Sequence, residues 1–162
     1  MLIIIGSGGF DMLYRTFIVA LLIFGIGSTA MAAGSTSSST PAATPSKYDE
    51  AVDAVDSGKY KRAARLLEKV VKSEPRNADA WNYLGFSYRN LQKLDESLDA
   101  YQQALAIDPN HRGANEYLGE LYLMTGDVAK AKERLETLKR ICTSGCEEYD
   151  DLEGAIEAHA SG

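Results

Sequence analysis

A 34-residue period runs through the middle of this 162-residue chain and constrains its fold more than any other feature. When the sequence is shifted by 34 residues, Leu84-Gly85 falls on Leu118-Gly119. A repeat of this length indicates stacked supersecondary units, each of which buries its apolar face only against its neighbours. The period divides the chain into three units, residues 44–77, 78–111 and 112–145.

Each unit is expected to contain two helices. In the middle unit, apolar residues recur at positions 81, 84 and 88 and again at 98, 101 and 105. This spacing predicts two amphipathic helices per unit. Gly85 and Ala104 are small where the two helices must approach closely, and Pro109 ends the second helix. Gly58 and Gly126 occupy the same turn position in units one and three, which predicts a left-handed residue there.

At these positions the chain resembles the tetratricopeptide repeat (TPR) family. The outer units depart from the family signature, with Lys47 and Glu50 where large apolar residues are usual and Thr143 in place of a proline. The resemblance implies an all-α fold, an α-solenoid of three TPR helix pairs over residues 47–145. The middle unit carries nearly the whole signature: Trp81, Leu84, Gly85, Tyr88, Ser97, Tyr101, Ala104 and Pro109.

A final helix over residues 146–160 is expected to cap the stack. Its apolar residues recur at spacings of three and four, as a helix that packs on one face requires. Its acidic residues fall on the other side, and we expect that side to face solvent. The apolar stripe consists of Tyr149, Leu152, Ala155, Ile156 and His159, and the acidic side of Glu147, Asp150, Asp151, Glu153 and Glu157.

The first 32 residues have the pattern of a secretory signal peptide. Arg15 precedes the apolar run Phe17–Ile26, and Ala30-Met31-Ala32 supplies a small-x-small cleavage site. Met12 is an alternative start, and an uncleaved membrane anchor is the alternative interpretation. Residues 33–46, rich in Ser, Thr, Ala and Pro, are expected to be a flexible linker. The sequence therefore predicts an exported protein, periplasmic or secreted, with no membrane contact beyond this segment.

The sequence offers little that points to catalysis. Its net charge of −6 argues against nucleic-acid binding, which needs a basic face. The two histidines, His111 and His159, are both expected at the surface, and no Ser or Cys nucleophile has a histidine partner at a recognisable spacing. We therefore expect no enzyme activity, no catalytic residue, no cofactor and no metal site.

The TPR resemblance implies a site for a protein or peptide partner. In this family the first helix of each unit lines a concave groove, in which Tyr83 and Tyr117 are expected to share one stripe. A family subgroup grips a C-terminal carboxylate with lysine, arginine and asparagine, and this chain lacks that clamp. The groove residues carried over are Tyr48, Val52, Val55, Asp79, Asn82, Tyr83, Phe86, Arg89, Asn90, Gly113, Glu116, Tyr117, Glu120, Leu123 and Met124.

Both cysteines lie in the segment ICTSGCEEYDDL, residues 141–152. Cys142 and Cys146 are not a C-x-x-C redox motif, and a closed zinc site would need four ligands. An exported chain with two cysteines is expected to oxidise them, and Gly145 allows the sharp turn between them. The sequence predicts an intrachain structural disulfide that fixes the angle between the last repeat and the capping helix.

These features favour an exported TPR adaptor or scaffold that binds a partner protein or peptide of unknown identity in its concave groove. Two alternatives remain. One is a thiol-active redox helper that uses Cys142 and Cys146, and the other is a structural subunit that self-associates.

Overall fold

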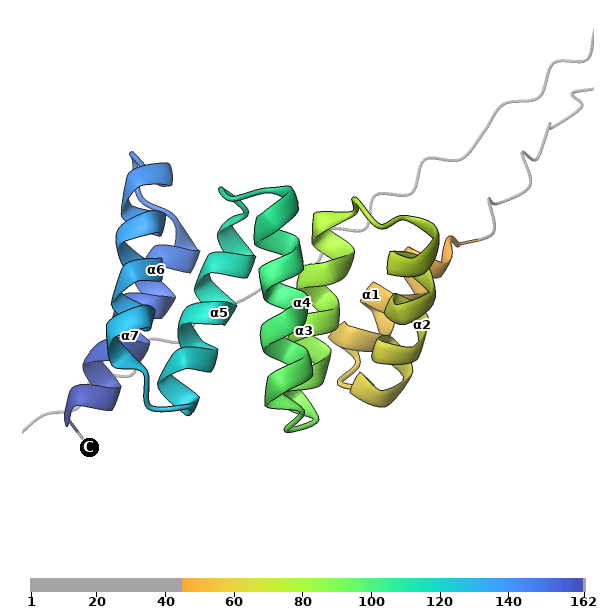
Figure 1. The fold of residues 1–162 in the computed structure, drawn as a ribbon, viewed down its shortest axis with the longest axis horizontal. Helices are drawn as coiled ribbons and strands as arrows, with labels where there is room; N and C mark the ends of the chain where they lie inside the picture. The colour runs from red at the N-terminus through yellow and green to blue at the C-terminus, as the bar shows by residue number, and fades with distance from the viewer. Residues whose placement is uncertain (1–44, 162) are drawn as a thin grey trace, which may run out of the picture. The chain divides into compact units, whose positions relative to one another are not determined.

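The computed structural model describes residues 45–161 and contains seven α-helices and no strand in that range (Figure 1). The predicted all-α class is therefore confirmed. The expected signal segment and residues 33–44 of the expected linker lie outside the described residues. The helices are α1 (Lys47–Asp56), α2 (Tyr60–Ser73), α3 (Ala78–Asn90), α4 (Leu94–Ile107), α5 (Arg112–Met124), α6 (Val128–Ile141) and α7 (Glu147–Ser161).

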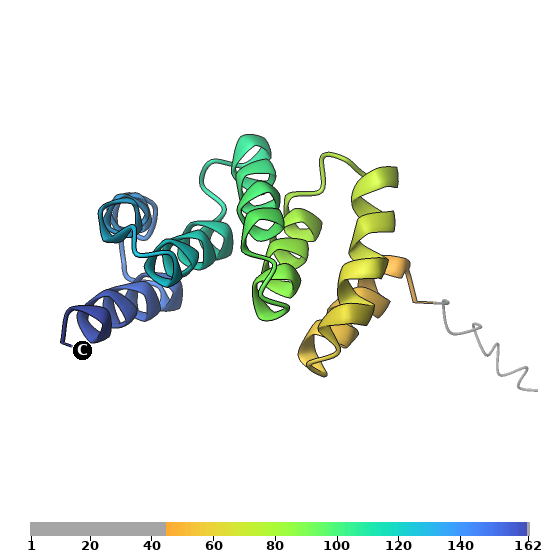
Figure 2. The ribbon, with the colours of Figure 1, turned by 60° about the horizontal axis from the view of Figure 1, so that its bottom comes forward.

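The helices form two layers (Figure 2). Helices α1, α3, α5 and α7 contact one another in succession and make one continuous layer, while α2, α4 and α6 each pack behind it. We call the side formed by α1, α3, α5 and α7 the inner face. No helix within residues 45–161 is both long enough and apolar enough to span a bilayer.

The turn inside each helix pair contains one left-handed residue, 34 positions from its counterpart. Gly58 has a φ of 67° and Gly126 a φ of 82°, as the sequence predicts. In the middle pair the same position is taken by Gln92, with a φ of 60°. A non-glycine residue tolerates this conformation only at a steric cost, so the turn geometry is imposed by the packing of the pair.

Polar side chains begin the inner-face helices. Ser46 accepts a hydrogen bond from the backbone N–H of Asp49 at the start of α1, and Asn77 caps α3 in the same way. At the start of α5 the cap is His111, whose Nδ1 accepts the backbone N–H of Ala114 at 3.1 Å. These caps satisfy amide groups that would otherwise lack partners, and they fix where α1, α3 and α5 begin.

Two glycines allow the helices to approach closely. A Cβ at Gly85 would lie 2.6 Å from the ring of Tyr101 on α4, so the sequence-predicted close contact is present. A Cβ at Gly119 would lie 2.5 Å from Leu152 of α7. Leu152 is fully buried, and α7 packs against both α5 and α6. The last helix therefore continues the inner layer and extends the surface that α5 begins.

Candidate binding cleft on the inner face

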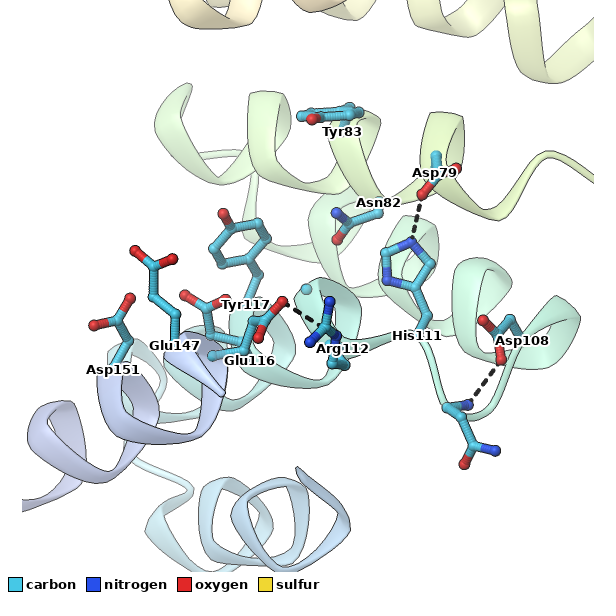
Figure 3. A pocket seen from close by; sticks show the side chains of 13 residues that line it. Asp79, Asn82, Tyr83, Asp108, His111, Arg112, Glu116, Tyr117, Glu147 and Asp151 are labelled. Atoms are coloured by element: carbon cyan, nitrogen blue, oxygen red, sulfur yellow. Dashed lines mark hydrogen bonds and ion pairs between the residues drawn. The ribbon is translucent and has the colours of Figure 1, made fainter. Parts of the chain in front are cut away.

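A cleft of about 540 Å³ opens on the inner face between α3, α5 and α7 (Figure 3). The turn between α4 and α5 closes one side of it. The residues that line it are Asp79, Asn82, Tyr83, Asp108, Asn110, His111, Arg112, Gly113, Glu116, Tyr117, Glu147, Glu148 and Asp151.

The lining is strongly acidic. It contains six carboxylates, contributed by α3, the α4–α5 turn, α5 and α7, against a single guanidinium, that of Arg112. Arg112 forms an ion pair with Glu148 across the cleft, with 3.4 Å between Nε and the carboxylate. Because the other carboxylates remain largely unneutralised, the cleft carries a negative potential. We call it the acidic cleft.

Glu116 is the most enclosed of these carboxylates, with 7% of the residue exposed. Its side chain forms no hydrogen bond or ion pair with any other described residue. Burial, together with the nearby charges of Glu120, Asp151 and Glu148, raises the pKa of Glu116 to about 8. A buried carboxyl group without a partner is unfavourable for folding, which makes it a candidate for binding.

Asn82 is a second buried polar group without a partner. It is 6% exposed, and its side-chain oxygen has no hydrogen-bond partner within residues 45–161. Figure 3 shows its amide in the cleft, between Tyr83 and Arg112. A cost of roughly 1–3 kcal/mol accompanies an unsatisfied buried polar group. A ligand that supplies a donor to Asn82 would recover part of that cost.

His111 connects α5 to α3 at the wall of the cleft. Its Nδ1 accepts the α5 amide, so the ring proton lies on Nε2, which donates to the Asp79 carboxylate at 3.0 Å. Only 14% of the His111 side chain is exposed. His111 is at the surface as expected, but it is half-buried, because the helix cap and the bond to α3 hold the ring against the protein.

Aromatic rings continue the inner face from α1 to α5. The rings of Tyr48 and Tyr83 lie 6.2 Å apart between centroids, and those of Phe86 and Tyr117 lie 5.0 Å apart. We call these four residues the aromatic row. Tyr83 and Tyr117 both line the acidic cleft, although each has a different ring as its partner. Burial, the largest cause, raises the pKa of Tyr48 and of Tyr117 to about 12.

Arg89 and Glu120, two of the expected groove residues, are bound to each other. Their side chains form an ion pair between α3 and α5, and the guanidinium also lies 5.4 Å from the Phe86 ring centroid and 5.3 Å from that of Tyr117. This pair fixes the angle of the rings and joins two inner-face helices. Its first role is therefore to hold the surface in place.

The other expected groove residues lie away from the cleft. Val52 is half-buried on α1, and Met124 is 47% exposed at the end of α5. Asn90 is exposed and donates to the backbone oxygen of Phe86 at 2.9 Å. Val55 and Leu123 are each 8% exposed and belong to the apolar core. Those two positions contribute to folding, because their side chains pack between helices.

A disulfide between Cys142 and Cys146 joins α6 to α7. The two Cα atoms are 5.6 Å apart, and Gly145 between them has a φ of 89°. The carboxylate of Glu148 lies within 4.8 Å of both sulfur atoms, but sulfurs bonded to each other are not thiolate metal ligands. The disulfide therefore fixes the start of α7, from which Glu147 and Glu148 enter the acidic cleft.

Sequence reasoning missed the contribution of α7 to this site. The acidic side of the helix was expected to face solvent, yet Glu147 and Asp151 line the cleft together with Glu148. The acidic side is exposed as expected, but α7 packs beside α5 as a further inner-face helix, so one edge of that side also borders the cleft, which the sequence did not predict. The signal that could have found it is the alignment of α7 with the first helix of a further 34-residue unit.

Two family models confirm the repeat. Both describe the tetratricopeptide repeat, and they match residues 48–112 and 90–156. The chain belongs to the tetratricopeptide repeat family. Among known proteins, this TPR chain is 34% identical over 76 residues to the General transcriptional corepressor trfA of Dictyostelium discoideum. That match covers 46% of this chain and only 6% of the relative, so the TPR chain spans a small part of its length.

Solved structures share the TPR fold. PcrH, in complex with the chaperone-binding region of PopD, has a TM-score of 0.64 at 16% identity, with 71% of this chain and 89% of that chain covered. The first TPR of Spaghetti (RPAP3), bound to the HSP90 peptide SRMEEVD, has a TM-score of 0.63 at 18% identity, covering 70% and 93%. At these identities the likeness establishes the α-solenoid fold alone.

Proposed function

We propose that this TPR protein is an exported scaffold whose inner face binds an extended segment of a partner protein. The observation that carries the proposal is the cleft itself. It combines two half-buried tyrosines with the enclosed carboxyl group of Glu116 and with Asn82, whose side-chain oxygen has no hydrogen-bond partner among the described residues. Apolar anchors beside a few convergent polar groups are typical of peptide-binding surfaces.

Structures with the same fold include complexes with segments of other proteins, which supports the proposed binding of a partner segment. PcrH is bound to a region of PopD, and the first TPR of RPAP3 is bound to a peptide of HSP90. The HSP90 peptide is acidic, with two glutamates and a terminal aspartate. Six carboxylates line the acidic cleft of this chain, so an acidic tail does not fit there. The proposed partner segment therefore differs in charge from that one.

Export is the second part of the proposal and rests on the sequence alone. The basic residue, apolar run and small-x-small site in residues 1–32 favour secretion. The disulfide agrees with an oxidising compartment such as the periplasm. No catalytic function is part of this proposal, because the buried polar groups of the cleft include no nucleophile paired with a base.

The test measures how strongly substitutions of the two cleft tyrosines weaken the binding of a partner that the wild-type protein has captured. The double variant Tyr83→Ala with Tyr117→Ala should bind the captured partner about 30-fold more weakly, since hot-spot aromatics contribute about 2 kcal/mol or more. The matched control is Tyr88→Ala with Tyr122→Ala, which removes two half-buried tyrosines from the same helices, α3 and α5, outside the cleft. Affinities measured by calorimetry, together with circular dichroism of each variant, decide the comparison.

An equal loss of affinity in both double variants would contradict the proposal, because the inner face would then have no special role. Loss of helical content in the Tyr83 and Tyr117 variant alone would show that those rings belong to the core.

A further inference from the structure

We propose that the acidic cleft is the subsite for a cationic side chain, a lysine or an arginine, carried by the extended partner segment. This inference rests on the proposed function and adds the chemistry of the partner. The negative charge of the cleft and its unpartnered polar group favour a basic segment.

The charges of the cleft are only partly neutralised. Asp79 accepts a hydrogen bond from His111, and Glu148 is paired with Arg112. Glu116, Glu147 and Asp151 form no ion pair within the described part of the chain. Two exposed carboxylates of α7 and the enclosed carboxyl group of Glu116 on α5 therefore face one space without a cation. A single ammonium or guanidinium placed there would interact favourably with all three.

An independent observation shows that the cleft is built for a ligand. Asn82, on α3, lines the same space and is 94% buried, and its side-chain oxygen has no hydrogen-bond partner within residues 45–161. The virtual Cβ of Gly113 would lie 3.2 Å from this amide, so the glycine keeps the α5 side of the cleft open. An extended peptide presents backbone N–H and C=O groups beside its side chains, and Asn82 can pair with them.

The rings at the cleft suit the stem of a basic side chain. Tyr83 and Tyr117 come from α3 and α5 and line the cleft together with Glu116 (Figure 3). Lysine and arginine bury their methylene stems on apolar surface while the charged end reaches polar groups. Aromatic faces also attract cations directly. The cleft thus offers carboxyl groups to the charged end of a basic side chain and tyrosine rings to its methylene stem.

Protonation of Glu116 is linked to this binding. The enclosed position and the charges of Glu120, Asp151 and Glu148 raise the pKa of this carboxyl group in the protein without a ligand. A bound cation stabilises the carboxylate and lowers that pKa again. Binding at neutral pH should therefore release a proton, an effect that a purely apolar contact would not produce.

The test uses three synthetic peptides and the full chain. Each peptide has the sequence acetyl-Ala-Tyr-Ala-X-Ala-Tyr-Ala-amide, in which X is lysine, norleucine or glutamate. Fluorescence anisotropy with labelled peptides measures affinity for the wild type, for Glu116→Gln and for Glu133→Gln. Glu133 is an exposed glutamate on α6 outside the cleft, so its variant makes the same chemical change elsewhere.

The wild type is expected to bind the lysine peptide about tenfold more tightly than the norleucine peptide, as a charge-assisted contact predicts. It should bind the glutamate peptide most weakly. Glu116→Gln should lose most of the lysine preference, whereas Glu133→Gln should keep it. Added salt should reduce the preference in the wild type, a readout that does not depend on any variant folding correctly.

Equal affinity for the lysine and norleucine peptides would overturn the inference and leave the proposed function standing, since the groove would still bind a peptide. Absence of binding to all three peptides would also overturn the inference. The proposed function would then be tested separately by the Tyr83 and Tyr117 variants. Self-association of the wild type that Glu116→Gln abolishes, without peptide binding, would assign the cleft to a second copy of the chain and so overturn the proposal.

Discussion

The aromatic row and the acidic cleft are neighbours on the inner face, but they come from different parts of the sequence. The aromatic row belongs to α1, α3 and α5, and Tyr83 and Tyr117 are one 34-residue period apart. Half of the cleft's carboxylates, Glu147, Glu148 and Asp151, come from α7, outside the three repeat units. The repeats therefore supply the aromatic rings and half of the carboxylates, and the capping helix supplies the other half of the charge of the proposed subsite.

The largest expected effect comes from separating α7 from α5. Leu152→Ala removes a fully buried side chain and should lower the free energy of unfolding by about 2–5 kcal/mol. It should also raise hydrogen exchange in α7 while α3 and α5 stay protected, so the acidic cleft is lost and the aromatic row remains. The double variant Gly119→Ala with Leu152→Ala refills part of the space and should be less destabilised. Additive losses in the double variant would contradict this contact.

A substitution that disturbs the packing behind the aromatic row should lower the stability by a smaller amount. Gly85→Ala places a methyl group against the ring of Tyr101, which lies 6.3 Å from Tyr117 between centroids, and should cost about 1–3 kcal/mol by overpacking. The control Gly154→Ala has open space around its new methyl group and should be neutral or stabilising. Denaturant unfolding measures both. Equal stability of the two variants would show that α3 and α4 are not tightly packed at Gly85.

Reduction of the disulfide should affect mainly α7 and the acidic cleft. Closure of so short a loop contributes about 2 kcal/mol in the chain-entropy model, and its removal should loosen α7 more than α1–α4. Cys142→Ser with Cys146→Ser should therefore raise hydrogen exchange at the start of α7 and weaken binding of the lysine peptide, with less effect on the norleucine peptide. Two thiols that react freely with an alkylating agent in the unreduced, exported protein would instead revive the redox alternative.

A further prediction concerns the pH dependence of stability. Glu116 has its pKa raised from 4.5 to about 8, and the charged groups around it are Glu120 on α5, Glu148 and Asp151 on α7, and Arg89 on α3. A raised pKa means that the contribution of Glu116 to stability is complete below pH 4.5 and is lost as the pH rises through about 8.

The melting temperature of the wild type should therefore fall more steeply than that of Glu116→Gln as the pH rises from 4.5 to about 8. All other groups are the same in both proteins, so the difference between the curves isolates this carboxyl group. Parallel curves would mean that Glu116 titrates as an exposed glutamate does.

Much of the fold could be predicted from the sequence because the same spacing of apolar and small residues recurs in all three units. The glycine at 85, the left-handed turns at Gly58 and Gly126, and the apolar stripe of α7 all follow from local spacing. The pairing of Arg89 with Glu120 could not be predicted, since it depends on the angle between α3 and α5. The cleft was missed for the same reason: whether Glu148 faces solvent or a neighbour is decided by how α7 docks.

The central claim is that a partner segment with a basic residue lies along the inner face. The most direct measurement is photocrosslinking from benzoylphenylalanine placed at Tyr83, on the inner face, and separately at Gln103, an exposed residue of α4. The purified partner is crosslinked to each protein, and the joined peptide is identified by mass spectrometry. We expect crosslinks from position 83 to a segment with a lysine or arginine near the joined residue, and few from position 103. Equal crosslinking from both positions, or a joined segment without a basic residue, would contradict the account.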